Sequence, residues 1–151
     1  MKIAASNKKV GFDYFILERY EAGIKLTGTE IKSVRLGKCN INDAYVLFKD
    51  QKVFLLNMHI AKYKEGNRFN HDETRSRELL LHQSERIKLA TKVKLDGLAI
   101  IPTKAYFVGS LLKVEIALCR GKKLTDKRQA LKEKDSKRTI EKVLKNSMRN
   151  S

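Results

Sequence analysis

The residues best suited to chemistry lie in one polar segment, Asn70-His71-Asp72-Glu73, and at two further histidines, His59 and His82. Hydrolysis would require a base, an orienting group and a nucleophile or metal ion to converge in one pocket. The sequence contains no Gly-rich phosphate loop, HExxH or GxSxG motif. A short acidic run in a polar loop is more often a turn capped by an Asx side chain. We therefore expect no catalytic residues.

Metal and thiol chemistry is equally weakly indicated. The three histidines share no ligand spacing, and the two cysteines, Cys39 and Cys119, form no CxxC pair. Without an export signal, the chain is expected in a reducing compartment with both thiols unpaired, Cys119 at the end of a buried strand. We expect neither a metal site nor a cofactor.

Positive charge is the stronger chemical signal. Residues 120–151 hold twelve Lys/Arg and four Asp/Glu, which is half of the chain's net charge of +16. Such a segment buries too little apolar surface to offset its ordering entropy, so we expect it to be largely unfolded when free. Its natural partner is a polyanion, because cations that neutralise phosphates release condensed counterions. The predicted organisation is a body, residues 1–119, and a basic tail, residues 120–151.

The body carries a second group of cations, two near its start and three in the polar stretch 63–77. Phe69 or Tyr63 would offer a stacking surface for an RNA base there. The alternative is that these charged residues are only the solvated faces of strands and loops, without a binding role. The residues of this predicted RNA-binding face are Lys8, Lys9, Arg68, Arg75 and Arg77.

A membrane partner is less favoured than nucleic acid. No apolar run approaches the ~18 residues of a membrane span, and residues 1–10 lack the apolar centre of a signal peptide. We therefore expect a soluble cytoplasmic protein without membrane contact.

The elements that must position these residues are mainly strands. Thr27 and Glu30 form a capping-box sequence that begins a short helix, and Gly37 is expected to end it. A second helix is expected over residues 84–95, ended by Asp96-Gly97, and Pro102 indicates an edge or a bulge. Strands are expected at 13–18, 23–26, 45–48, 53–58, 77–82, 98–103 with 105–108, and 112–118. About six strands without βαβ rhythm predict a small closed antiparallel barrel, which leaves no exposed edge.

The tail has a helical pattern besides its charge. Ile140, Val143, Leu144 and Met148 fall on one stripe of a helix, with lysines and arginines around them. This pattern predicts a helix that forms when the tail binds its partner. The alternative is a frayed charged terminus without a role.

The chain as a whole resembles small protein B, the SsrA-binding or tmRNA-binding protein family of bacterial trans-translation. The match runs from about Lys8 to Lys145, in order and in register. The motifs that carry it are Asp13-Tyr-Phe-Ile16, Tyr20-Glu-Ala-Gly23, Leu26-Thr-Gly-Thr-Glu-Ile-Lys-Ser33, Arg35-Leu-Gly-Lys38, Asn57-Met-His-Ile60, Gly66-Asn-Arg-Phe-Asn-His-Asp72, Arg77-Glu-Leu-Leu-Leu81, Lys113-Val-Glu-Ile-Ala117 and Arg120-Gly-Lys-Lys-Leu-Thr-Asp-Lys-Arg128.

The resemblance implies an oligonucleotide-binding-like (OB-like) barrel of about six antiparallel strands with three helices and a disordered tail. It implies binding to the tRNA-like domain of tmRNA and delivery of that RNA to stalled ribosomes for rescue and peptide tagging. Partners would be tmRNA, the ribosomal decoding centre and the empty mRNA channel, where the tail becomes helical. Through tmRNA they would extend to alanyl-tRNA synthetase and elongation factor Tu.

The resemblance also assigns residues. RNA binding maps to Glu21, Leu80 and Lys113, of which only Lys113 is explained by charge. Glu21 would need a donor on the RNA or a structural partner. The ribosome-binding tail motif maps to Gly121, Lys122, Lys123, Asp126, Lys127 and Arg128, and the contact of the tail helix to Val143 and Leu144.

Two other functions fit parts of the sequence. A structural ribosomal protein with a basic extension would share the size, charge and tail. A small basic nuclease would use His71, Asp72 or Glu73.

Overall fold

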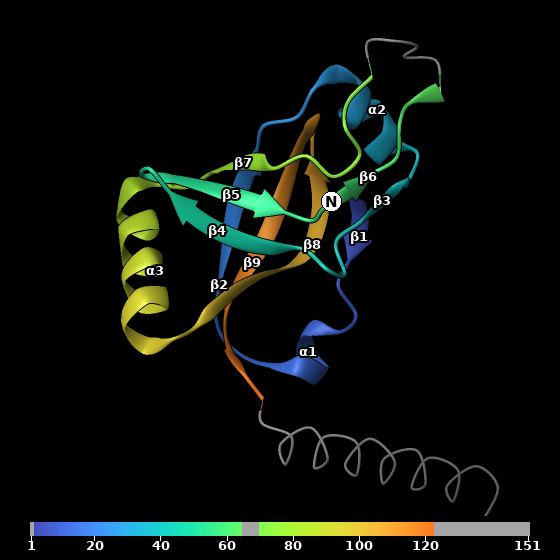
Figure 1. Ribbon diagram of the computed structural model, residues 1–151. Coiled ribbons are helices and arrows are strands. Elements are labelled where there is room, and N and C mark those ends of the chain that lie inside the picture. The colour runs from blue at the N-terminus through green and yellow to red at the C-terminus, as the bar shows by residue number, and fades with distance from the viewer. Residues whose placement is uncertain (1, 65–69, 123–151) are drawn as a thin grey trace, which may run out of the picture.

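The computed structural model describes residues 2–64 and 70–122, and it is mainly β (Figure 1). The helices are α1 (Val10–Asp13), α2 (Gly28–Arg35) and α3 (Gln83–Asp96). The strands are β1 (Lys2–Ser6), β2 (Tyr14–Ile24), β3 (Cys39–Asn40), β4 (Tyr45–Lys49), β5 (Lys52–Leu56), β6 (His59–Ile60), β7 (Arg77–Leu80), β8 (Ala99–Val108) and β9 (Leu111–Gly121).

Seven strands form one antiparallel sheet in the order β1-β8-β9-β2-β7-β5-β4, and β3 pairs with β6. The sheet curls so that β4 and β5 lie over β9 and β8 in Figure 1. Within the described residues no ladder joins its two edge strands, β1 and β4. The closed barrel was therefore a wrong prediction, and the OB-like assignment stays a prediction. One physical reason is that β1, which was not predicted, pairs with residues 104–107 of β8 and so takes part of the edge at which a closing strand would pair.

Local signals placed several element ends correctly. Thr27 accepts from the Glu30 amide while the Glu30 carboxylate accepts from the Thr27 amide, so the predicted capping box is formed. Gly37 and Gly97 follow α2 and α3 with left-handed φ of 74° and 63°. The predicted irregularity at Pro102 is present as a register shift in the β8–β9 ladder.

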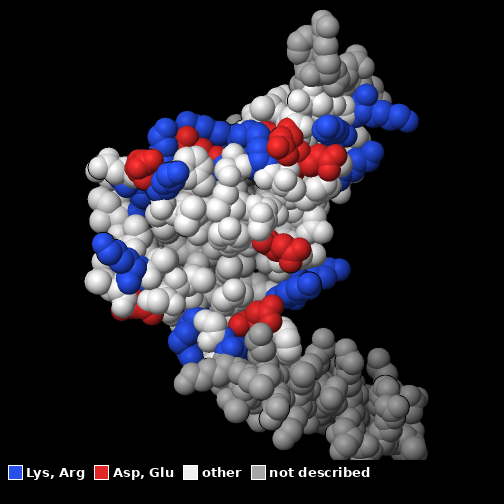
Figure 2. Space-filling view, in the orientation of Figure 1, with Lys and Arg blue, Asp and Glu red and all other residues white. Residues whose placement is uncertain are grey.

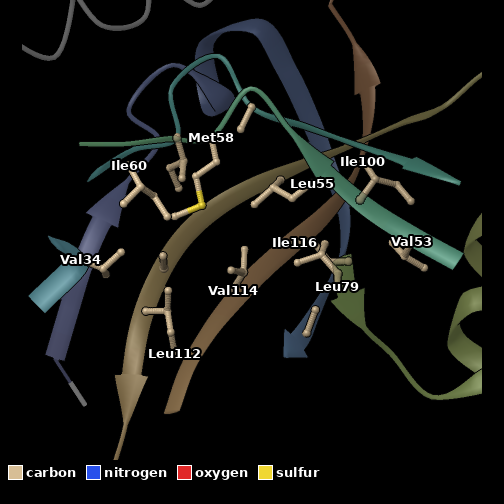
Figure 3. Close-up of a cluster of buried hydrophobic side chains, with 14 of the residues drawn as sticks. Val34, Val53, Leu55, Met58, Ile60, Leu79, Ile100, Leu112, Val114 and Ile116 are labelled. Carbon is tan, nitrogen blue, oxygen red and sulfur yellow. The ribbon is translucent and has the colours of Figure 1, made fainter. Parts of the chain in front are cut away.

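A core of aliphatic side chains lies between the two halves of the curled sheet (Figure 3). In this view Val53 and Leu55 of β5 project toward Val114 and Ile116 of β9. All four are essentially excluded from solvent. Because successive residues of a strand point to opposite faces, the neighbours of these core residues face outward. That outward face of β2, β9 and β8 carries the candidate site.

Candidate nucleic-acid interface

Strand register brings residues from four strands into one row on the outward face of the sheet. Gly23 of β2 pairs with Leu80 of β7 on one side and with Lys113 of β9 on the other. Lys113 in turn pairs with Tyr106 of β8. Glu21 lies two residues before Gly23 on β2, so it faces the same side.

A surface pocket of about 350 Å³ occupies part of this face. It is lined by Glu21, Gly23, Leu80, Leu81, His82, Glu85 and Lys113. All three residues that the family resemblance links to RNA therefore lie around one pocket, although they are far apart in the sequence. One ammonium group, two carboxylates, one imidazole and two leucine side chains suit a nucleoside with hydrogen-bond donors better than a cluster of phosphates.

Leu80 is a surface residue of this pocket. Its side chain is 49% exposed, whereas Leu79, which precedes it, is 2% exposed and belongs to the core. Gly23 leaves room beside it, because a Cβ at position 23 would lie 3.4 Å from the Leu80 Cβ. Leu80 and the adjacent Gly23 therefore present apolar surface at the pocket.

Glu21 is held by a tyrosine from two strands away. The Tyr106 hydroxyl donates a hydrogen bond to Oε2 of Glu21. Burial, followed by the hydrogen bond to Glu21, raises the pKa of Tyr106 to about 12, so its hydroxyl remains a donor at neutral pH. No sequence pattern indicated this contact, apart from the unexplained acid at position 21.

Arg77 is not part of the surface. Its side chain is 0% exposed, Nε donates to the Glu30 carboxylate, and Nη1 lies 2.6 Å from the Met58 carbonyl oxygen. Nη2 donates to the carbonyl oxygens of Asp72 and Glu73, 3.3 and 3.2 Å away. With its guanidinium enclosed in this way, Arg77 holds the 72–77 loop. The prediction that Arg77 contacts RNA was therefore wrong.

Arg75 shares the same carboxylate. Its Nε lies 3.1 Å from Oε2 of Glu30, and its Nη2 also donates to the Lys25 carbonyl oxygen. Arg75 is only partly exposed, and its guanidinium is directed toward α2. The remaining predicted arginine of this face, Arg68, lies outside the described residues, as does Phe69.

The nuclease candidate His71 has both ring nitrogens engaged. Nε2 lies 2.8 Å from the Ile60 carbonyl oxygen, which can only accept, so Nε2 carries the proton. Nδ1 then accepts from the Thr29 hydroxyl, 2.9 Å away. Asp72 accepts from the Thr74 amide, which is the predicted Asx turn, and Glu73 pairs with His59. These contacts connect loop 70–74 to α2 and β6.

Thiol and metal chemistry have no geometric support in the part of the chain that the structure describes. Burial raises the pKa of Cys39 and of Cys119 to about 11, so neither is a reactive thiolate at neutral pH. No group of three or more potential ligands converges within residues 2–64 and 70–122. In the same residues, no helix has the length and apolarity to cross a membrane.

The first residues of the predicted tail belong to the sheet. Gly121 pairs with Tyr14, and the Lys122 amide donates to the Asp13 carbonyl oxygen at 2.9 Å. Two cations lie near the Phe15 ring, Arg120 at 4.5 Å and Lys122 at 4.9 Å from its centroid. Other tail residues assigned to ribosome binding lie outside the described residues, namely Lys123, Asp126, Lys127, Arg128, Val143 and Leu144.

Charge is unevenly distributed over the molecule. On the face shown in Figure 2, lysine and arginine side chains lie mainly around the rim, and the middle, over β4 and β5, is largely uncharged. Two apolar residues of β4, Tyr45 and Leu47, are exposed. The centre of this face therefore offers few groups to phosphates.

A small basic β-protein with a pocket suited to nucleosides on its sheet is of the nucleic-acid-binding class. The family model described as "SmpB protein" matches residues 4–146, so the chain belongs to the SmpB family.

Similar proteins agree over nearly the whole chain. The SsrA-binding protein of Acholeplasma laidlawii is 52% identical over 149 residues, which cover 99% of this chain and 100% of the relative. The SsrA-binding protein of a Sulfurihydrogenibium species is 52% identical over 148 residues, covering 98% and 97%. A solved structure described as "tmRNA-SmpB: a journey to the center of the bacterial ribosome" is 42% identical, with a TM-score of 0.68, and covers 83% of this chain and 92% of its own.

Proposed function

We propose that this protein binds tmRNA and acts with it on the ribosome in trans-translation. The observation that carries the proposal is the meeting of Glu21, Leu80 and Lys113 around one exposed pocket. These three residues lie on three different strands, and the chain that brings them together belongs to the SmpB family. Its relatives are named SsrA-binding proteins, and its structural neighbour is a tmRNA–SmpB complex described in relation to the ribosome.

The body is the part that binds the tRNA-like domain of tmRNA. Lys113 supplies a cation for a phosphate, and Leu80 with Gly23 supplies an apolar surface for a sugar or base. Glu21 accepts a hydrogen bond from the RNA. The ion-pair cluster of Glu30, Arg75 and Arg77 acts indirectly, by fixing the start of β7, on which Leu80 lies.

The tail, residues 120–151, is the part proposed to enter the decoding centre and the empty mRNA channel. Its charge supports this role, because an RNA-lined channel binds a cationic chain by counterion release. That the tail is unfolded when free and helical when bound stays a prediction, since residues 123–151 lie outside the described part. Contacts with alanyl-tRNA synthetase and elongation factor Tu are proposed only through tmRNA.

The proposed activity is binding without catalysis. Delivery of an RNA needs no bond-making residue in the protein, and both nitrogens of His71 are engaged by structural hydrogen bonds. Ribosomes are cytoplasmic in bacteria, so the proposed location is the cytoplasm.

A binding titration tests the proposal. The full chain is titrated against the transcribed tRNA-like domain of tmRNA and, as the matched control, an elongator tRNA of equal length. Saturable binding at lower concentration to the tRNA-like domain is expected. Equal binding to both RNAs at every salt concentration would contradict the proposal and favour a general basic RNA-binding protein.

A further inference from the structure

The presence of the acidic residue Glu21 in a proposed RNA-binding pocket is not explained by attraction between charges. A carboxylate next to a phosphate is repelled, so in an RNA site it must either pair with a cation of the protein or accept from a donor on the RNA. Among residues 2–64 and 70–122, the ion pairs do not include Glu21, although Lys113 lines the same pocket. A structural pairing with lysine is therefore not the role of Glu21 in this structure.

The partner that Glu21 does have is Tyr106. The two residues lie on β2 and β8, with β9 between them. Tyr106 pairs with Lys113, and its hydroxyl reaches diagonally over β9 to Oε2 of Glu21. Within the described part of the chain, Oε1 of Glu21 accepts no hydrogen bond, so one carboxylate oxygen is fixed and the other is available at the pocket.

Tyr106 is well fixed for this task. It is 6% exposed, although it belongs to the outward face of the sheet, and the Lys104 ammonium lies 5.7 Å from its ring centroid. Glu21, by contrast, is an exposed side chain with three rotatable bonds, so without a partner it would sample many rotamers. A rigid donor next to a flexible acceptor reduces the entropy that the acceptor loses on binding.

We propose that Tyr106 is a positioning residue for RNA recognition, whose hydroxyl orients the Glu21 carboxylate so that its other oxygen accepts from a hydroxyl or amino group of a bound nucleotide. This inference rests on the proposed function. It makes Glu21 a reader of a nucleoside donor, in contrast to Lys113, whose ammonium is suited to a phosphate.

Two tyrosine variants test the inference with the full chain and the transcribed tRNA-like domain. Tyr106→Phe removes only the hydroxyl and is expected to weaken binding roughly 2- to 12-fold, the factor for ordering one flexible side chain. Tyr20→Phe is the matched control, because the Tyr20 hydroxyl also donates to a glutamate of β2, Glu18, but on the opposite face of the strand. It is expected to bind as the wild type does.

A double-mutant cycle separates positioning from a general structural effect. In a Glu21→Ala background, Tyr106→Phe is expected to cause no further loss, because its effect acts through the carboxylate. Neither change is expected to alter the dependence of affinity on salt, because neither removes a phosphate contact. Equal binding by Tyr106→Phe and wild type, or independent losses in the cycle, would overturn the inference.

Glu21→Asp keeps the test decisive if Tyr106→Phe does not fold. This change alters only an exposed residue and withdraws the carboxylate from the Tyr106 hydroxyl by one methylene group. It is expected to weaken binding at least as much as Tyr106→Phe, and wild-type affinity would overturn the inference. A wild-type chain that does not prefer the tRNA-like domain would refute the proposed function itself, and the inference with it.

Discussion

Glu30 is the most informative residue to change, because its buried carboxylate forms ion pairs with two arginines. Its side chain is 0% exposed and accepts from Arg77, which is also 0% exposed, and from Arg75. Burial by itself would raise the pKa of Glu30, but hydrogen bonds from Arg75, the Thr27 amide and Arg77 hold the pKa below its ordinary value of 4.5. Glu30→Gln preserves the shape and removes only the charge.

The expected loss of unfolding free energy follows from the charge that the substitution leaves behind. Arginine cannot release its proton in a protein, so Glu30→Gln leaves the Arg77 cation buried without its counter-charge. Breaking a buried ion pair in this way costs about 3 to 5 kcal/mol of unfolding free energy. For a chain of this size that corresponds to a Tm lower by roughly 6 to 20 °C.

Thermal melts followed by circular dichroism measure this loss. The matched control is Glu18→Gln, since the Glu18 carboxylate is also bound by two cations, Lys88 and Lys92, but is partly exposed. Because exposed pairs contribute little, its Tm is expected to change by no more than about 2 °C. A Glu30→Gln protein that melts with the wild type would refute the reasoning.

Wild type and Glu30→Gln should also differ in how their stability depends on pH, and the sign of this difference is defined. Because the folded-state pKa of Glu30 is lowered, the unfolded chain takes up a proton that the folded chain does not. The contribution of Glu30 is therefore complete above the ordinary value of 4.5 and is lost as pH falls through the folded-state pKa. The difference in Tm between wild type and Glu30→Gln should shrink below about pH 5.

Four further predictions concern RNA binding and peptide tagging. Lys113→Ala should leave the melt unchanged and reduce the salt slope of RNA affinity by about one unit, for one phosphate contact; an unchanged slope would exclude Lys113 from the site. Leu80→Asp should melt natively and lose RNA affinity, because Leu80 is exposed; a collapsed melt would contradict its surface position. Truncation after Lys122 should preserve the fold and RNA binding but abolish peptide tagging. Within the tail, Val143→Asp with Leu144→Asp and Val143→Ser with Leu144→Ser should both abolish tagging; wild-type tagging by the Ser pair would contradict a packed helix.

The sequence predicted those features whose causes are local. The capping box at Thr27 and Glu30 lies within four residues, and the glycine ends of α2 and α3 depend on one backbone conformation. Lys2–Ser6 has one β-branched residue, and its strand is defined by pairing with β8, which is about a hundred residues away. The closed barrel was predicted from the number of strands and from the exposed edges of an open sheet, and neither reveals which strands pair.

The candidate site was predictable only as a set of residues. The family resemblance named Glu21, Leu80 and Lys113, but their convergence depends on strand register, which the sequence does not reveal. Arg77 was misplaced for the same reason. Its positive charge suggested contact with RNA. In the structure Arg77 is buried and pairs with Glu30, which lies 47 residues earlier in the chain.

The most direct test of the central claim is to identify the RNA that co-purifies with the full-length chain from its own cells at moderate salt. A single enriched species with a tRNA-like end, lost in a Glu21→Ala, Leu80→Asp and Lys113→Ala triple variant that melts natively, is the expected result. Ribosomal RNA in stoichiometric amount with no such species would contradict tmRNA binding and favour a structural ribosomal protein.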